Sequence, residues 1–382
     1  MERFAFLIHP IDVQRDVARK YPIARYLPVW LLEWYIKHRD PIVVSEIKGI
    51  RSRTGAEAEG WFIGCPLTPR QMVTLPIDDV WDKLEQCARI AHGLGARILG
   101  LGAFTSVVGD GGITLSQRVP ELAITTGNSY TVATAIEGVR SANALMGREM
   151  AESTVAVVGA SGSIGATCAQ VLGREARSIT LIGRSPDRLK ATADRLTAAG
   201  VSSVSITTDV AEGLRNADAV VTVTSSVDAV ILPEQLKPGA VVCDVARPRD
   251  VSVRVARERN DVLVIEGGVV KVPGAMTTPR LDKPGAQFSF GFPPGTAYAC
   301  MSETMMLALE GRYECFTLGK EVSLQQVDET NAMAARHGFE LAGFRSFERA
   351  VTPEEIERVR QNAAARPSGS ADPAAARREA GA

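Results

Sequence analysis

A glycine-rich turn between an apolar strand and a helix constrains the fold of this chain more than any other feature. The run Thr154–Val158 is apolar and β-branched, and Gly159, Gly162 and Gly165 follow it. Glycine is required where such a turn takes a positive φ, where backbone meets a pyrophosphate and where the helix packs on the strand. A helix N-terminus also attracts phosphate. The pattern predicts a dinucleotide-binding turn, with a glycine turn that binds no ligand as the alternative.

The residues after the next strand indicate which dinucleotide is bound. In NAD-binding domains an Asp or Glu ends that strand and binds the ribose 2′-hydroxyl. Here the strand Ser178–Ile182 runs into Gly183, Arg184 and Ser185, with Arg188 nearby and no carboxylate at the strand end. Because arginine suits a 2′-phosphate, NADPH is the predicted cofactor, with solvated surface arginines as the alternative. The residues expected to bind it are Gly159, Ser161, Gly162, Ser163, Ile164, Gly165, Arg184, Ser185, Arg188, Thr224 and Ser225.

Strand-like and helical runs alternate along most of the chain. Between residues 153 and 266 the expected strands are Thr154–Val158, Ser178–Ile182, Val204–Thr207, Ala219–Val223, Ala240–Asp244 and Val262–Ile265. This rhythm predicts an α/β fold with a doubly wound parallel sheet, the Rossmann arrangement. Strands over Phe4–Ile8, Ile42–Gly49, Trp61–Cys65 and Arg97–Leu101, with a helix over Ile77–His92, predict a second α/β domain.

These patterns divide the chain into five parts. The expected parts are an N-terminal α/β substrate domain (1–128), a connecting helix (129–150), the dinucleotide-binding domain (151–270), a C-terminal segment (271–350) whose helix returns to the cleft between the domains, and a disordered tail (364–382).

Composition excludes several classes of function. The formal net charge of −1 gives no reason to expect nucleic acid as a partner. No apolar run reaches the roughly 18–20 residues of a membrane helix, and the first residues lack a secretory signal pattern, so a cytoplasmic protein is expected. The six cysteines and four histidines show no metal-ligand spacing, and no metal site is predicted.

Cys300 is a candidate nucleophile in the C-terminal segment. It lies in the first turns of a helix expected over Thr296–Glu310, where the helix N-terminus favours a thiolate. Glu303 lies on the same helix face and suits a proton-handling or orienting role. Taken alone, Cys300 also fits a packed core position and Glu303 a solvated one.

Several short motifs in matching order resemble the long-chain acyl-acyl-carrier-protein reductases, the NADPH-dependent enzymes best known from cyanobacteria that make fatty aldehydes. The resemblance covers most of residues 1–345. The segments that carry it are Gly102–Ser106, Thr125–Ser129, Val157–Gly165, Gly267–Val270, Ala299–Met306 and Arg336–Phe339. After Ser106 the sequence departs from the family pattern.

The resemblance implies that Cys300 attacks the thioester of an acyl carrier protein or coenzyme A, and that hydride transfer then releases an aldehyde. Glu303 would protonate the leaving thiol or position a water. Ser106, Thr126 and Asn128 would donate hydrogen bonds to the oxyanion. An aldehyde-consuming partner enzyme and at most peripheral membrane contact are expected.

Two other functions remain open from the sequence. One is an NADP-dependent dehydrogenase of a small polar hydroxy or keto acid, similar to shikimate dehydrogenase, and the other is a non-catalytic NADP-sensing protein. His337 is a weak site candidate. The aromatic stretch Tyr26–Trp34 is compatible with an acyl tunnel, a membrane contact or a core position.

Overall fold

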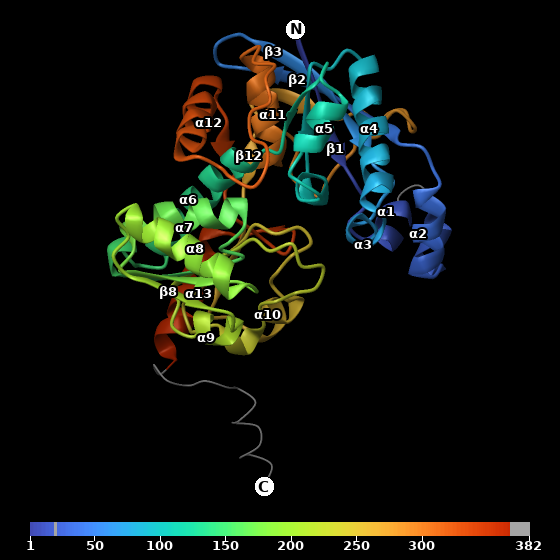
Figure 1. Cartoon of the computed structure of the whole chain (residues 1–382). Helices are drawn as coiled ribbons and strands as arrows, with labels where there is room; N and C mark the ends of the chain where they lie inside the picture. The colour runs from blue at the N-terminus through green and yellow to red at the C-terminus, as the bar shows by residue number, and fades with distance from the viewer. Residues whose placement is uncertain (19–20, 367–382) are drawn as a thin grey trace. The chain divides into compact units, whose positions relative to one another are not determined.

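The computed structural model describes residues 1–18 and 21–366, which form two compact units. The first unit contains Met1–Ala133 and Val269–Ala342, and the second contains Thr134–Gly268 and the chain from Gly343 onwards. The boundary between residues 133 and 134 falls inside helix α6 (Asn128–Leu145), which ends before the expected residue 150. Figure 1 shows the chain coloured from its N-terminus to its C-terminus.

The second unit is built on a six-stranded parallel sheet in the order β11-β10-β9-β6-β7-β8. The first of these strands along the chain, β6, lies in the middle, the next two lie to one side of it, and the last three lie to the other. This order is that of the doubly wound dinucleotide-binding fold, so the predicted fold class is confirmed. The strands are β6 (Thr154–Val158), β7 (Ser178–Ile182), β8 (Val204–Thr207), β9 (Ala219–Thr222), β10 (Val241–Asp244) and β11 (Leu263–Glu266).

Hydrophobic burial on both faces explains why these central strands consist largely of valine and isoleucine. Strands β9, β10 and β11 have four residues each, and all of these residues are buried. The other elements of this unit are α7 (Ser163–Glu175), α8 (Pro186–Ala198), α9 (Val210–Leu214), α10 (Val253–Glu258), α13 (Pro353–Ala365), η3 (Met150–Glu152), η4 (Pro233–Gln235), β16 (Arg345–Ser346) and β17 (Arg349–Ala350). Helix α13 includes the first two residues of the expected 364–382 tail, and residues 367–382 lie outside the described residues.

The first unit contains a mixed six-stranded sheet in the order β13-β2-β3-β1-β4-β5. Strands β3, β1, β4 and β5 are parallel, and β2 and β13 add an antiparallel edge. The bounds are β1 (Glu2–Ile8), β2 (Ile42–Arg51), β3 (Glu57–Gly64), β4 (Ile98–Leu101), β5 (Ala123–Thr125) and β13 (Gly274–Thr277). Residues 269–342 belong to this unit, and β13 pairs with β2, whereas residues 271–350 were expected to form a separate C-terminal segment.

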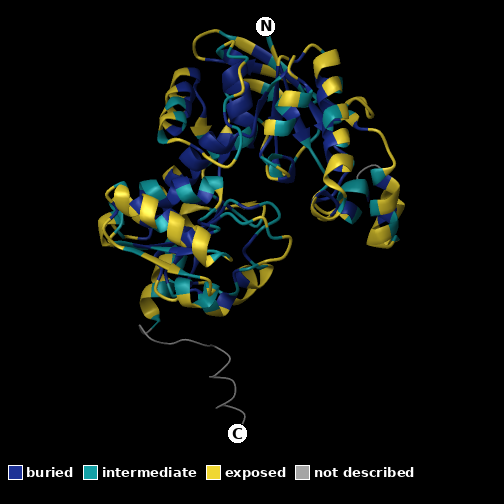
Figure 2. Ribbon diagram, in the orientation of Figure 1, coloured by how far each residue is buried: buried dark blue, intermediate teal, exposed yellow. Residues whose placement is uncertain are grey.

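Two helices cover the opposite faces of this sheet (Figure 1). Alternate residues of a strand point to opposite faces, and Ala5 and Leu7 of β1 pack with the buried side of α4 (Ile77–Gly93). On the other face, α11 (Ala299–Leu309) lies so close to β4 that a Cβ at Gly100 would meet Thr304 Oγ1 at 2.1 Å. All residues of α11 except Cys300 are buried, as Figure 2 shows for this central helix.

Smaller elements complete the first unit. They are α1 (Val13–Ala18), η1 (Pro22–Tyr26), α2 (Val29–Lys37), α3 (Pro69–Thr74), η2 (Ala103–Ser106), α5 (Ile113–Arg118), β12 (Val269–Lys271), β14 (Thr296–Tyr298), α12 (Leu324–His337) and β15 (Glu340–Leu341). The buried ring of His337 hydrogen-bonds to Ser52 Oγ at 2.7 Å and to Glu310 Oε1 at 3.0 Å, so this weak site candidate links α12 to its neighbours. Among the described residues, no helix has the length and hydropathy that a membrane crossing requires.

His9 is held neutral where the chain leaves β1. Its Nε2 accepts a hydrogen bond from the backbone N–H of Phe104 at 3.1 Å, and its Nδ1 lies 3.2 Å from the carbonyl oxygen of Pro10, which requires the proton on Nδ1. Burial lowers the pKa of His9 from 6.5 to about 4. The imidazole thereby fixes the start of η2, which follows β4.

The low pKa of His9 predicts a pH-dependent contribution to stability. The folded protein binds this proton more weakly than the unfolded chain, so the contribution is complete above about pH 6.5 and is lost as the pH falls through about 4. We expect the unfolding free energies of wild type and His9→Asn to converge by about 2–3 kcal/mol between about pH 7 and pH 4. Denaturant unfolding at several pH values measures this difference. The exposed His92→Asn is the control, and a pH-independent gap for His9→Asn would contradict the assignment.

Candidate functional site

Close backbone contacts explain two of the three glycines in the turn after β6. Gly159 has a φ of +83°, and a Cβ there would lie 2.6 Å from the carbonyl oxygen of Val223. A Cβ at Gly165 would lie 2.3 Å from the carbonyl oxygen of Gly159, so this glycine allows α7 to pack on the turn. A Cβ at Gly162 would meet only the Gly159 oxygen at 3.3 Å. Packing therefore does not explain Gly162, but close approach of a ligand does.

The N-terminus of α7 suits a phosphate. Gly162 is its N-cap and supplies no side-chain hydrogen bond to the first turn. Ser161, Ser163 and Ile164 are partly exposed around it. Backbone N–H groups at such a terminus, together with the helix dipole, provide the polar surface that a pyrophosphate needs. The residues present therefore fit a dinucleotide.

The predicted arginines lie at the end of β7, beside this turn. A Cβ at Gly183 would lie 3.7 Å from Ser161 Oγ, which shows how close the two loops are. Ser185 caps α8 by accepting a hydrogen bond from the backbone N–H of Arg188 at 3.4 Å. Arg184 and Arg188 are exposed, and within the described part of the chain neither forms an ion pair. Both guanidinium groups are available to an anion from solvent.

A buried carboxylate shapes the loop after β9. Asp250 accepts hydrogen bonds from the hydroxyl groups of Thr222 and Thr224, at 2.6 and 2.5 Å, and from the Thr224 backbone N–H at 2.8 Å. The Thr224 hydroxyl is thus already used within the protein, while Ser225 beside it is exposed. Sequence reasoning missed Asp250 because nothing in its local spacing distinguishes it from a surface aspartate.

A second buried carboxylate lies close to Asp250. Asp244 accepts backbone N–H groups, including that of Val251 at 3.0 Å. Burial raises the pKa of Asp244 to about 6 although Arg247 acts in the opposite direction. Two acidic side chains therefore organise the carboxyl ends of β9 and β10, next to the glycine turn.

Cys300 lies at the other candidate site, in the first unit. It is the second residue of α11, it is partly exposed, and it forms no disulfide. Its neighbour is the loop that follows β5: a Cβ at Gly127 would lie 2.3 Å from Cys300 Cα and 2.4 Å from Cys300 Cβ. The N-terminus of α11 therefore meets the carboxyl end of β5. Ligands of parallel α/β sheets bind at this edge, where a helix N-terminus also favours a thiolate.

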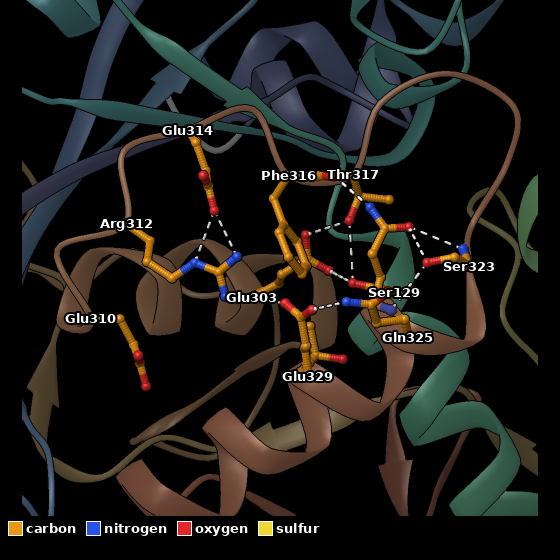
Figure 3. A network of polar contacts seen from close by, with 12 residues as sticks. Ser129, Glu303, Glu310, Arg312, Glu314, Phe316, Thr317, Ser323, Gln325 and Glu329 are labelled. Atoms are coloured by element: carbon orange, nitrogen blue, oxygen red, sulfur yellow. Dashed lines mark hydrogen bonds and ion pairs between the residues drawn. The ribbon is translucent and has the colours of Figure 1, made fainter.

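Glu303 holds that loop in place. Its fully buried carboxylate accepts hydrogen bonds from Thr125 Oγ1 and Ser129 Oγ, each at 2.5 Å, from Thr317 Oγ1 at 3.0 Å and from the Tyr130 N–H at 3.1 Å. Figure 3 shows Glu303 between Ser129 and Thr317. Both carboxylate oxygens are engaged by protein donors. Of the proton-handling and orienting roles that the sequence left open for Glu303, these contacts favour an orienting role, and we interpret Glu303 as a positioning residue.

The three expected oxyanion donors differ in their environments. The Thr126 hydroxyl donates to the carbonyl oxygen of Thr317 at 3.0 Å, and the Ser106 hydroxyl donates to that of Ala103 at 2.7 Å. Because a hydroxyl has one proton to donate, neither is oriented toward a ligand. Asn128 is buried at the start of α6, next to Gly127 in the loop that touches Cys300. Asn128 also has an interaction partner within the protein, and it stays a candidate donor through its position beside Gly127.

Four partly exposed aromatic rings shortly before Cys300 in the chain pack together with the buried ring of Phe62. Phe290 packs against Phe288 at 4.9 Å, Phe62 at 5.4 Å and Tyr298 at 5.6 Å between ring centroids. Phe292 lies 4.6 Å from Tyr298, which is two residues before Cys300. Phe62 also packs against Phe6 of β1, on the sheet face that α11 covers. We name these five rings, Phe62, Phe288, Phe290, Phe292 and Tyr298, the aromatic strip.

A cavity of about 570 Å³ lies at the opposite edge of the same sheet. It is lined by residues before β4 and β5, among them Arg97 and Leu122, and by Tyr313 and Cys315. None of the predicted site residues lines it. The candidate residues Thr126, Asn128 and Cys300 lie at the carboxyl edge of the sheet, away from this cavity.

Gly127 provides a test of the contact with Cys300. Replacing it with Ala introduces strain at a φ of +73° and a clash with the Cys300 backbone, so the loop must move. We expect Gly127→Ala to slow alkylation or acylation of Cys300 by at least about tenfold. Gly147→Ala is the matched control, because Gly147 has a φ of +79° but a Cβ there would have no neighbour within 4 Å. Thiol labelling followed by peptide mass analysis measures the rate, and equal rates in both variants would contradict the contact between Gly127 and Cys300.

Comparison with known proteins gives a family-model match and two informative relatives. Residues 140–266 match the model described as shikimate / quinate 5-dehydrogenase. The aminotransferase PigE of Serratia sp. is 31% identical over 300 residues, which are 76% of this chain and 33% of PigE. This chain therefore spans about one third of that relative.

The second relative is similar in length to this chain. The long-chain acyl-[acyl-carrier-protein] reductase of Synechococcus elongatus is 27% identical over 345 residues, covering 86% of this chain and 95% of the relative. Among solved structures, a dipicolinate synthase of Bacillus halodurans matches over 49% of this chain and 62% of its own length, with 16% identity and a TM-score of 0.32.

These findings support an oxidoreductase of the NAD(P)-binding type. The matched model covers β6 to β11, the strands that show the doubly wound order, and the glycine turn is suited to a nicotinamide dinucleotide. The acyl-acyl-carrier-protein reductase expected from the sequence is supported as a related family.

Proposed function

We propose that this protein reduces a long-chain acyl thioester to a fatty aldehyde with NADPH, through an acyl group held on Cys300. One observation carries the proposal: Cys300 is the partly exposed residue of an otherwise buried helix, and it lies in the first turn of that helix at the carboxyl edge of a parallel sheet. The similarity to the Synechococcus reductase supports the proposal because it covers 86% of this chain.

The chemistry assigned to the protein's own residues begins at the thiolate. Cys300 Sγ attacks the thioester carbonyl, a new C–S bond forms, and the carrier thiol leaves with a proton from solvent. Asn128 is the proposed donor to the oxyanion, and Glu303 keeps the loop of Gly127 against Cys300. NADPH, when bound, supplies the hydride that reduces the enzyme thioester. Cys300 thiolate then departs and the aldehyde is released.

The surroundings of Cys300 favour an apolar substrate. The aromatic strip reaches Tyr298, two residues before Cys300, and all its rings except the buried Phe62 are partly exposed. Contact of an acyl chain with an aromatic or aliphatic surface stabilises the complex by about 25 cal/mol for each Å² of apolar surface removed from water. A small polar hydroxy acid, the alternative suggested by the match to shikimate dehydrogenase, would gain little from such a wall.

The similarity to PigE agrees with aldehyde formation. PigE is named an aminotransferase, and this chain corresponds to about a third of it. An aldehyde is a carbonyl compound that an aminotransferase can convert to an amine. We therefore propose that the aldehyde passes to a second enzyme.

An acyl-enzyme intermediate predicts a covalent adduct at one cysteine. We expect the wild-type protein, mixed with a long-chain acyl-CoA and no NADPH, to gain the mass of one acyl group, and Cys300→Ala to gain none. Adding NADPH should remove the adduct and release aldehyde. Intact-mass analysis measures the adduct, and Cys315→Ser is the control because Cys315 is exposed.

Other outcomes of that experiment favour other functions. Aldehyde formation that persists in Cys300→Ala would overturn the proposed mechanism. Oxidation of a hydroxy acid by that variant with NADP⁺ would favour the dehydrogenase alternative. Cofactor binding without turnover of any thioester would favour an NADP sensor.

A contact of Arg184 and Arg188 with the 2′-phosphate of NADPH predicts that their removal changes the preference for NADPH over NADH. Arg184→Ala/Arg188→Ala removes the two exposed cations beside the turn and should weaken NADPH binding about 10- to 100-fold, with little effect on NADH. Titration of protein fluorescence with each cofactor measures the affinities. Lys190→Ala is the control, because Lys190 lies in the same helix but pairs with Asp194 at 3.1 Å. Equal losses for NADPH and NADH would contradict a 2′-phosphate contact.

A further inference from the structure

Large apolar side chains are exposed on η1 and α2. Tyr26 is 86% exposed, Trp30 68% and Trp34 58%, and Ile23 and Val29 are exposed as well. We name these five residues the η1–α2 face. Exposure of this extent excludes the core position that the sequence left open for the aromatic rings of the stretch Tyr26–Trp34.

Packing within this segment explains why the rings point outward. Leu32 and Ile36 lie one turn apart on the inner side of α2, where they form a small hydrophobic cluster with Val13, Ala18 and Ala24. Trp30 and Trp34 are also four residues apart, and they occupy the outer side. The helix is therefore already anchored by its inner residues, and folding does not require the two tryptophans.

Cations outnumber acids by three to two in residues 21–41, which include the η1–α2 face. Arg25 and Arg39 are exposed and Lys37 is partly exposed, and Arg39 lies 5.4 Å from the ring centre of Tyr35. Two acids lie in this stretch: Glu33 is partly buried and accepts a hydrogen bond from Thr68 Oγ1 at 2.9 Å, and Asp40 is exposed next to Arg39. Tyrosine and tryptophan flanked by cations are the side chains that bind at a membrane interface.

We propose that the η1–α2 face binds the surface of a membrane with anionic headgroups. Trp30, Trp34 and Tyr26 enter the headgroup region, while Arg25 and Arg39 contact lipid phosphates. The segment 9–41 connects the carboxyl end of β1 to β2, which starts opposite Gly64 at the carboxyl end of β3. Cys300 lies at the same edge of the sheet. If the proposed function holds, the apolar aldehyde forms on the membrane side of this unit.

Vesicle sedimentation with the full chain tests the proposal. We expect the protein to sediment with phosphatidylglycerol-containing vesicles, less with pure phosphatidylcholine vesicles, and less again at high salt. Trp30→Ser/Trp34→Ser should lower the bound fraction at least about tenfold. Leu145→Ser/Val253→Ser is the matched control, because both side chains are 52% exposed in the second unit. Arg25→Glu/Arg39→Glu should remove the preference for anionic lipid.

Two further measurements separate this proposal from others. Cys300→Ala should bind vesicles like wild type, so a failure of the acyl-enzyme mechanism leaves this test intact. Trp30→Ser/Trp34→Ser should still be acylated by a short, water-soluble thioester. If neither vesicle type sediments the wild-type protein, or if light scattering finds a dimer that this double variant converts to monomer, the η1–α2 face is not a membrane surface.

Discussion

The buried carboxylate of Glu303 is the interaction on which the first unit's candidate site depends. A carboxyl group buried away from water must be satisfied by hydrogen bonds from the protein, and Glu303 receives these from three separate segments: the end of β5, the start of α6 and the residue Thr317. Meeting that requirement fixes the loop containing Gly127 against the first turn of α11. The position of one thiol is thus set by an acid that need not touch substrate.

In the second unit, the buried carboxyl group of Asp250 has a similar role. This acid comes after β10 and binds the threonines at the end of β9, so it holds the loop next to Gly159. In both units a buried acid fixes a loop at the carboxyl edge of a parallel sheet, where ligands of such folds bind. The hydroxyl groups of Thr126 and Thr224, which the sequence suggested as ligand contacts, instead stabilise these loops.

The sequence predicted the features that arise from local chemistry. Strand β9, for example, was predicted to within one residue of its end. Its valine-rich run between turns was predictable because such a run buries its side chains best as a strand in the middle of a sheet. The glycine turn was also predictable from local chemistry, because its spacing of glycines follows from positive φ and close backbone contacts. The partners of Glu303 were not, since helical spacing places it on the Cys300 side of α11 but says nothing of Thr125, which lies 178 residues away in the chain. The pairing of β13 with β2 was missed because edge pairing is also non-local.

The late position of α11 in the chain has a consequence for biosynthesis. The sheet it covers is made from residues 2–125 and 274–277, yet the helix itself is synthesised only after the whole of the segment 134–268. Until the ribosome has released residue 309, Phe6 and its neighbours on that sheet face have no covering helix. The nucleotide-binding unit can begin to fold during this interval, whereas the nascent N-terminal sheet presents an apolar surface of the kind that chaperones bind.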